Sequence, residues 1–172
     1  MNGKTQFITL NGIGIALFVV LTMCLQVPVF ENYYLCLGYV VMMVYCYRYG
    51  AASGAIVGSL GVVLYCVLTS GLRGMPGWTI GNLAIGIVCG IAFMRLKKLE
   101  SDWLRRGLMV LVIVLMTAVG ILGLKSLTEC LLYAQPMAVR MAKNSYAFVA
   151  DVVMMIVSIP VCELLDKRKS DE

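Results

Sequence analysis

Long apolar runs separated by short polar segments dominate this chain. A helix that crosses a bilayer needs about 20 mostly apolar residues, within a range of about 17 to 25. Six segments fit or approach this length: 8–27, 33–47, 50–70, 77–94, 104–124 and 145–165. The second is the shortest, and helix tilt or local thinning of the bilayer would accommodate it. We therefore predict an all-α integral membrane protein, with residues 1–172 forming a single domain of six transmembrane helices.

The composition agrees with lipid as the solvent of most of the chain. Hydrophobic residues make up 61% of it and charged residues 13%, whereas soluble domains average about 45–50% and about 25%. The seven cysteines are isolated from one another and histidine is absent, so we expect no metal site. Walker, HExxH and GxSxG motifs are also missing. We therefore expect neither an enzyme nor a bound cofactor.

Lysine and arginine are distributed unevenly between the two ends of the predicted bundle. Six spans place both termini on one side, where ten of the 14 cationic residues fall: Lys4, Arg48, Arg95, Lys97, Lys98, Arg105, Arg106, Lys167, Arg168 and Lys169. The other side receives Arg73, Lys125, Arg140 and Lys143. The positive-inside rule then predicts that both termini are cytoplasmic. Because topology explains the net charge of +5, we expect no nucleic-acid partner.

Polar and aromatic residues gather at the predicted outer end. The stretch "GLRGMPGWTIGN" (residues 71–82) interrupts the apolar runs, and its Trp78 and Asn82 share a helix face four residues apart. The outer loops bring further candidates to this end: Asn32, Tyr33, Arg73, Arg140 and Asn144. A pocket with aromatic walls and a few polar groups suits a small heterocyclic ligand. The alternative for Trp78 and Tyr33 is simple anchoring at the membrane interface.

Asp151 lies inside the sixth apolar segment, about 10 Å along the helix from Asn144. Asn144, Phe148 and Asp151 share one helix face. An ionisable group at that depth is costly unless it is paired or hydrated. Asp151 therefore lines a ligand site or, alternatively, makes a hydrogen bond or a salt bridge to Arg73 or Arg140 that only holds helices together.

Glycines recur at four-residue intervals on several segments. Those of the third and fourth segments, among them Gly54, Gly58, Gly86 and Gly90, predict close packing of helices inside the bundle. Gly12 and Ala16 form a similar small patch on the first segment. Their spacing alone leaves open whether this patch packs internally or meets another membrane subunit.

Three stretches carry a resemblance to a known family. They are "VPVFENYYLCLGYVV" (27–41), "YGAASGAIVGSLG" (49–61) and "PGWTIGNLAIGIVCG" (76–90). Over nearly its whole length the chain resembles the S components of energy-coupling factor (ECF) transporters, and the third stretch resembles their riboflavin-transporter-like branch. S components are the substrate-binding subunits of vitamin importers in bacterial and archaeal cell membranes.

The resemblance implies capture of a vitamin or related micronutrient in an outward-facing pocket. It implies association with a membrane coupling subunit and two cytoplasmic ATPases, with Gly12 and Ala16 at the coupling-subunit contact. Trp78, Asn82, Asn144 and Asp151 fall where family members keep pocket residues.

Two other functions stay open from the sequence, a stand-alone secondary transporter and a membrane scaffold without ligand. The identity of the vitamin is open too. Outer cations such as Arg73 and Arg140 would attract an anionic ligand, whereas Asp151 would hold a ring nitrogen, an amine or a hydroxyl group.

Overall fold

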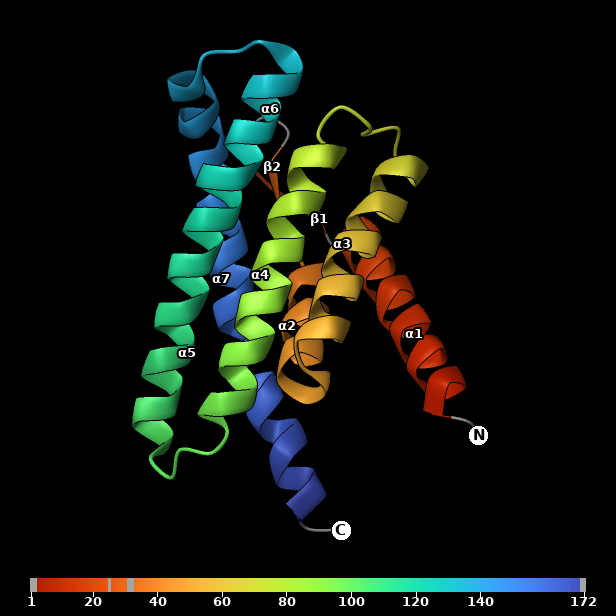
Figure 1. Cartoon of the computed structure of the whole chain (residues 1–172), viewed down its shortest axis with the longest axis vertical. Coiled ribbons are helices and arrows are strands. Elements are labelled where there is room, and N and C mark those ends of the chain that lie inside the picture. The colour runs from red at the N-terminus through yellow and green to blue at the C-terminus, as the bar shows by residue number, and fades with distance from the viewer. Residues whose placement is uncertain (1–2, 25, 31–32, 171–172) are drawn as a thin grey trace.

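Helices running roughly along one direction make up most of the molecule (Figure 1). The computed structural model describes residues 3–24, 26–30 and 33–170. In chain order its helices are α1 (Gly3–Cys24), α2 (Gly38–Tyr49), α3 (Ala51–Leu68), α4 (Met75–Leu96), α5 (Asp102–Thr117), α6 (Ser126–Tyr133) and α7 (Met137–Ser170). A π-helical segment, Ala118–Lys125, joins α5 to α6. Two antiparallel strands, β1 (Gln26–Phe30) and β2 (Tyr33–Cys36), lie between α1 and α2.

Five helical stretches within these ranges are long and apolar enough to cross a membrane. They are α1, α3, α4, the continuous stretch Asp102–Tyr133, and Met137–Leu165 of α7. The prediction of a mainly helical membrane protein is confirmed at this level. The exact number of membrane spans and the cytoplasmic side of the termini stay predictions.

The segment predicted as the second span, 33–47, has a different structure. Its first residues belong to β2, and the helix that follows, α2, has only 12 residues. Twelve residues span about 18 Å, against about 30 Å for the hydrocarbon core of a bilayer. Because α2 packs against α1, α3, α4 and α7, its apolar side chains meet protein rather than lipid, which its composition alone does not distinguish.

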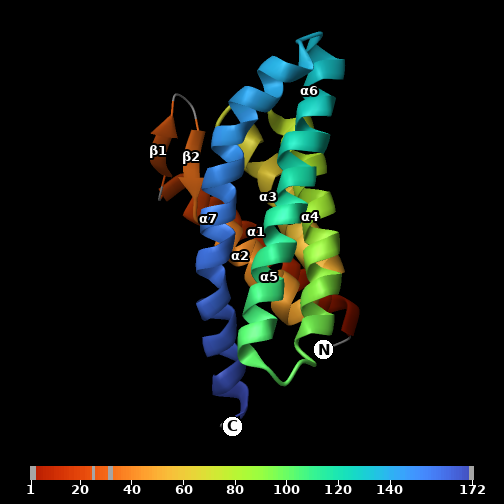
Figure 2. The same ribbon diagram turned by 90° about the vertical axis from the view of Figure 1, so that its left-hand side faces the viewer.

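The first helix, α1, also lies nearer the N-terminus than the predicted first span, 8–27, because the hairpin follows it. α1 ends at Cys24, and Gln26 pairs with Cys36 across the two strands. Pro28 cannot continue a helix, and the valines and aromatic residues around it favour strands. Figure 2 shows the hairpin beside α7, in the half of the bundle away from the C-terminus.

The region predicted as the last outer loop, 125–144, is mostly helical. α6 extends the helical stretch that begins with α5 as far as Tyr133, and α7 begins at Met137. Ala134 adopts a left-handed conformation with φ +50°, which ends α6 in the manner of a helix C-cap. Polar residues of this region are therefore held on helices.

The glycines of α3 and α4 pack these helices inside the bundle, as predicted. A Cβ added to Gly86 would lie 2.6 Å from the Cα of Ala55, and one added to Gly90 would lie 2.4 Å from the Cα of Ala51. Gly50, with φ +82°, makes the tight connection between α2 and α3. These contacts bring α2, α3 and α4 together around the core.

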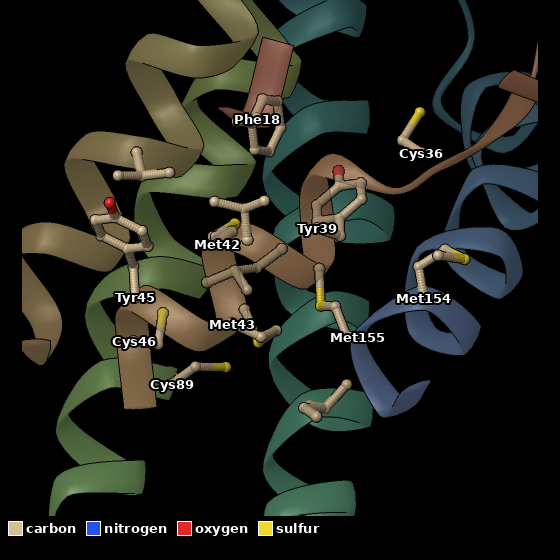
Figure 3. Close-up of a cluster of buried hydrophobic side chains, with 14 of the residues drawn as sticks. Phe18, Cys36, Tyr39, Met42, Met43, Tyr45, Cys46, Cys89, Met154 and Met155 are labelled. Carbon is tan, nitrogen blue, oxygen red and sulfur yellow. The ribbon is translucent and has the colours of Figure 1, made fainter. Parts of the chain in front are cut away.

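The core lies around α2. Figure 3 shows Tyr39, Met42 and Met43 of α2 together with Met155 of α7, all of them fully buried. α1 begins and α7 ends at one end of the bundle, which also carries the α4–α5 connection (Figures 1 and 2). The α3–α4 and α6–α7 connections lie at the opposite end, which we call the loop end.

Candidate functional site

A cavity of about 700 Å³ opens at the loop end of the bundle. Its wall is built by the end of α1, β2, α3, the α3–α4 connection, α4, the end of the π-helical segment and α7. Its charged lining residues are Arg73, Lys125 and Asp151, and its aromatic ones are Tyr65 and Trp78. The cavity falls within the 300–1,000 Å³ typical of small-molecule sites, and its mixture of aromatic and polar groups is typical of them too.

Asp151 supplies the carboxylate of the cavity. It lies on α7 one turn after Ala147, another lining residue, and only 5% of its surface is exposed. Asp151 contacts the Tyr39 hydroxyl and interacts electrostatically with Lys125. A buried carboxylate thus faces a hollow next to a cation, instead of the salt bridges to Arg73 or Arg140 that the sequence left open.

Lys125 enters the cavity from the last residue of the π-helical segment. Its Nζ lies 6.0 Å from the centre of the Trp78 ring, at the outer limit for a cation–π interaction. Gly77 allows α4 to approach it, because a Cβ there would lie 3.2 Å from the Lys125 Cγ. The ammonium group is therefore held close to an aromatic wall and to Asp151.

Trp78 is fixed by a chain of hydrogen bonds that leads into the core. Its indole Nε1 donates to the Tyr39 hydroxyl at 2.7 Å, and that hydroxyl lies 3.1 Å from the Asn82 Oδ1, to which it donates. The Asn82 amide donates to the Gly58 carbonyl at 3.3 Å. Tyr65 packs edge-on against Trp78, with ring centres 5.6 Å apart. Because Tyr39 occupies the indole N–H, Trp78 offers the cavity its ring rather than a hydrogen bond.

At the mouth of the cavity, the α3–α4 connection is attached to α6. The guanidinium of Arg73 lies 5.0 Å from the centre of the Tyr133 ring. The Tyr133 hydroxyl in turn donates to the Arg73 carbonyl. Arg73 is exposed, so its charge remains at the rim.

Of the predicted site residues, Arg73, Trp78 and Asp151 line this cavity, whereas Asn82 lies behind its wall. Asn82 is fully buried and supports Trp78 through Tyr39. It shares the predicted helix face with Trp78, but that face passes from the cavity into the core one turn further along α4.

Arg140 and Asn144 belong to a separate buried cluster between α6 and α7. The Asn144 amide donates to the Ser126 hydroxyl at 2.9 Å and to Glu129 at 3.1 Å. Arg140 lies 3.5 Å from the same carboxylate. Neither residue is among those that line the cavity, because the helical extension of α6 covers this part of α7.

The remaining predicted positions lie elsewhere. Phe148 is half-buried and packs against the core. Asn32 lies outside the described residues, and Tyr33 is described only through its backbone pairing with Phe30. Gly12 and Ala16 are exposed on α1, and a Cβ at Gly12 would have no neighbour within 4 Å.

Four residues of the site are not evident from the sequence. Lys125, Cys36 and Cys66 line the cavity, and Tyr39 supports it. The sequence predicts an outer loop at Lys125, because this residue follows a long apolar run. Its spacing of four from Glu129 is a sequence signal that the helix continues past it. Within the described ranges, no group of three or more Cys, Asp or Glu residues is placed to hold a metal ion.

Comparison with known families is decisive. The model of the family described as "ECF-type riboflavin transporter, S component" matches residues 2–167. The chain belongs to this family. As an S component of an ECF-type transporter, it is a multi-pass protein of the cell membrane that serves vitamin uptake, and it is not an enzyme.

A solved structure shares the fold of this S component. It is described as the crystal structure at 2.1 Å of the S-component for biotin from an ECF-type ABC transporter. The two agree with a TM-score of 0.73 over 96% of this chain and 93% of that one, at 16% sequence identity. A comparison with curated proteins finds no match.

Proposed function

We propose that this S component captures a vitamin or a related small heterocyclic micronutrient in the cavity at the loop end. The observation that carries the proposal is the cavity of about 700 Å³, lined by Trp78, Arg73 and Asp151. The sequence predicts all three as site residues. Family membership supports a role in capture, and the size of the cavity supports a ligand of vitamin dimensions.

Different residues of the cavity would contact different parts of the ligand. Trp78, held by Tyr39, provides a rigid surface for stacking a ring. Asp151 provides a hydrogen-bond acceptor at depth, and Arg73 provides a positive charge at the rim. Gly71 and Gly74 border the opening, where the α3–α4 connection would move when a ligand enters.

The loaded protein would deliver its cargo through association with a membrane coupling subunit and two cytoplasmic ATPases. The small, exposed surface around Gly12 and Ala16 on α1 supports this part of the proposal. A flat patch of this kind lets another helix approach closely within lipid.

The binding proposal is tested with protein purified in detergent. Mass spectrometry identifies any small molecule that copurifies, and isothermal titration calorimetry measures the affinity for riboflavin, biotin and any compound so identified. We expect Trp78→Ala and Asp151→Asn each to weaken binding at least about 10-fold, since a stacked ring or a hydrogen bond to a charged group contributes about 1–3 kcal/mol.

Trp103→Ala is the matched control, because Trp103 is 86% exposed on α5 at the end of the bundle opposite the cavity. Its affinity should equal that of the wild type. Unchanged affinity in both cavity variants would remove the site assignment. Uptake that persists without any ATPase and collapses with the proton gradient would favour a stand-alone secondary transporter instead.

A further inference from the structure

Lys125 and Asp151 are two buried residues of opposite charge that line the same cavity and interact electrostatically. They come from different helices, and 9% and 5% of their surfaces are exposed. Within a membrane protein such a pair is costly, and apolar side chains of similar size are often at least as stabilising. The cluster of Glu129, Arg140 and Asn144 already joins α6 to α7 nearby. These helices are thus joined by polar contacts besides the Lys125–Asp151 pair.

Two backbone features place Lys125 at the cavity: the π-helical segment that ends with it, and Gly77 of the neighbouring helix α4. A π-helical segment changes the face on which the following residues lie, and such segments occur frequently at functional sites. Lys125 is the last residue of this one. Gly77 of α4 leaves room for both its side chain and its carbonyl, which would lie 3.2 Å and 3.0 Å from an added Cβ.

The two side chains present complementary hydrogen-bonding groups. An ammonium group only donates, and an ionised carboxylate only accepts. Together the pair is electrically neutral, so a ligand group with a net charge would leave an unbalanced charge in a buried site. A neutral group that offers an acceptor beside a donor satisfies both partners at once. A ring carbonyl next to a ring N–H, as in a lactam, imide or cyclic urea, is such a group.

We propose that Lys125 and Asp151 together select a flat heterocycle that presents a carbonyl and an adjacent N–H on one edge. The Lys125 ammonium donates to the ring carbonyl, and the Asp151 carboxylate accepts from the ring N–H. The ring lies against Trp78, whose own N–H is already occupied by Tyr39. Any charged tail of the ligand extends toward Arg73 at the rim. This inference rests on the proposed function and adds Lys125 to the site as a specificity-determining residue.

The test compares riboflavin, which carries such an edge, with 3-methylriboflavin, in which a methyl group replaces the hydrogen of that edge. Biotin and its N-methylated ureido derivative form a second matched pair. Affinities are measured by calorimetry for the wild type, Lys125→Met, the neutral double variant Lys125→Met/Asp151→Asn, and Lys143→Met. Lys143 is exposed on α7 and does not line the cavity, so its variant controls for the loss of one positive charge.

We expect the wild type and Lys143→Met to bind one unmethylated compound at least about 10-fold more tightly than its methylated partner. The double variant, which leaves no unpaired buried charge, should remain folded and lose most of this discrimination. Circular dichroism and gel filtration verify its fold. Discrimination that survives in a folded double variant, or is absent from the wild type, would overturn the inference.

The same experiment separates this inference from the proposed function. If the protein binds neither riboflavin, biotin nor their methylated derivatives, the chemical structure of the molecule that copurifies tests the inference. One that lacks a carbonyl beside an N–H overturns the inference and leaves the capture function intact, whereas one that has this edge supports both. A protein that binds no compound and copurifies with none contradicts both.

Discussion

Tyr39 connects the wall of the cavity to the core. Its hydroxyl accepts a hydrogen bond from Trp78, donates to Asn82 and contacts Asp151, while its ring packs edge-on against Phe18. The side chain is fully buried. One residue of the short helix α2 thus holds in place a tryptophan from α4 and lies beside a carboxylate from α7.

We predict that Tyr39→Phe destabilises the protein by about 1–3 kcal/mol, because Trp78 and Asn82 each lose a buried hydrogen-bond partner. Binding of any compound that stacks on Trp78 should weaken as well. The free energy of unfolding in detergent and calorimetric titration measure the two effects. Tyr49→Phe removes a hydroxyl from a side chain that is 45% exposed and serves as the control. Equal stability of the two variants would contradict a supporting role for Tyr39.

At the scale of elements, two helix features position the site. α3 and α4 pack with their backbones close together at Gly86 and Gly90, which brings Tyr65 and Trp78 side by side. The π-helical segment, together with α6, carries Lys125 to the cavity and Glu129 to the cluster behind it. The first feature follows from glycine spacing in the sequence. The second does not, because an apolar run has the same composition in an α-helix and in a π-helix.

We predict that Gly90→Ala lowers the stability of the bundle by about 1–3 kcal/mol, because its Cβ would lie 2.4 Å from the Cα of Ala51 and force α3 and α4 apart. Gly107→Ala on α5 is the matched control. A Cβ there meets nothing within 4 Å, and replacing a glycine inside a helix by alanine contributes up to about 1 kcal/mol of stability. Thermal unfolding in detergent should therefore shift in opposite directions. A shift in the same direction and of the same size would contradict close packing at Gly90.

At the scale of the whole molecule, the cavity and the proposed partner surface are separate. The cavity lies at the loop end, whereas Gly12 and Ala16 lie on the outside of α1 and do not line it. A change on this face of α1 should therefore affect assembly without affecting capture.

We predict that Gly12→Leu retains wild-type ligand affinity but lowers ATP-dependent uptake and copurification with the coupling subunit at least about 10-fold, since the leucine side chain would separate two closely packed helices. Quantitative pull-down and transport in reconstituted vesicles measure the loss. Gly107→Leu, on an equally open position of α5, controls for an added apolar side chain. Equal uptake by the two variants would contradict a partner contact at Gly12.

The sequence by itself determined the membrane class and the candidacy of Arg73, Trp78 and Asp151. Both follow from the free energy of placing each residue in lipid, because that free energy depends on local composition and charge. Close packing of α3 on α4 was predictable for a related reason, since small residues at helical spacing leave room for a neighbouring backbone.

Only the tertiary structure decided which of the candidates meet. It buried α2, whose composition resembles that of a span, and it placed Asn82 behind the wall of the cavity and Asn144 in a different cluster. It also brought Lys125 to Asp151, across 26 positions of sequence. A cavity exists only where faces of several helices come together, and those faces are set by packing, by a π-helical segment and by helix ends rather than by the properties of one residue or one segment.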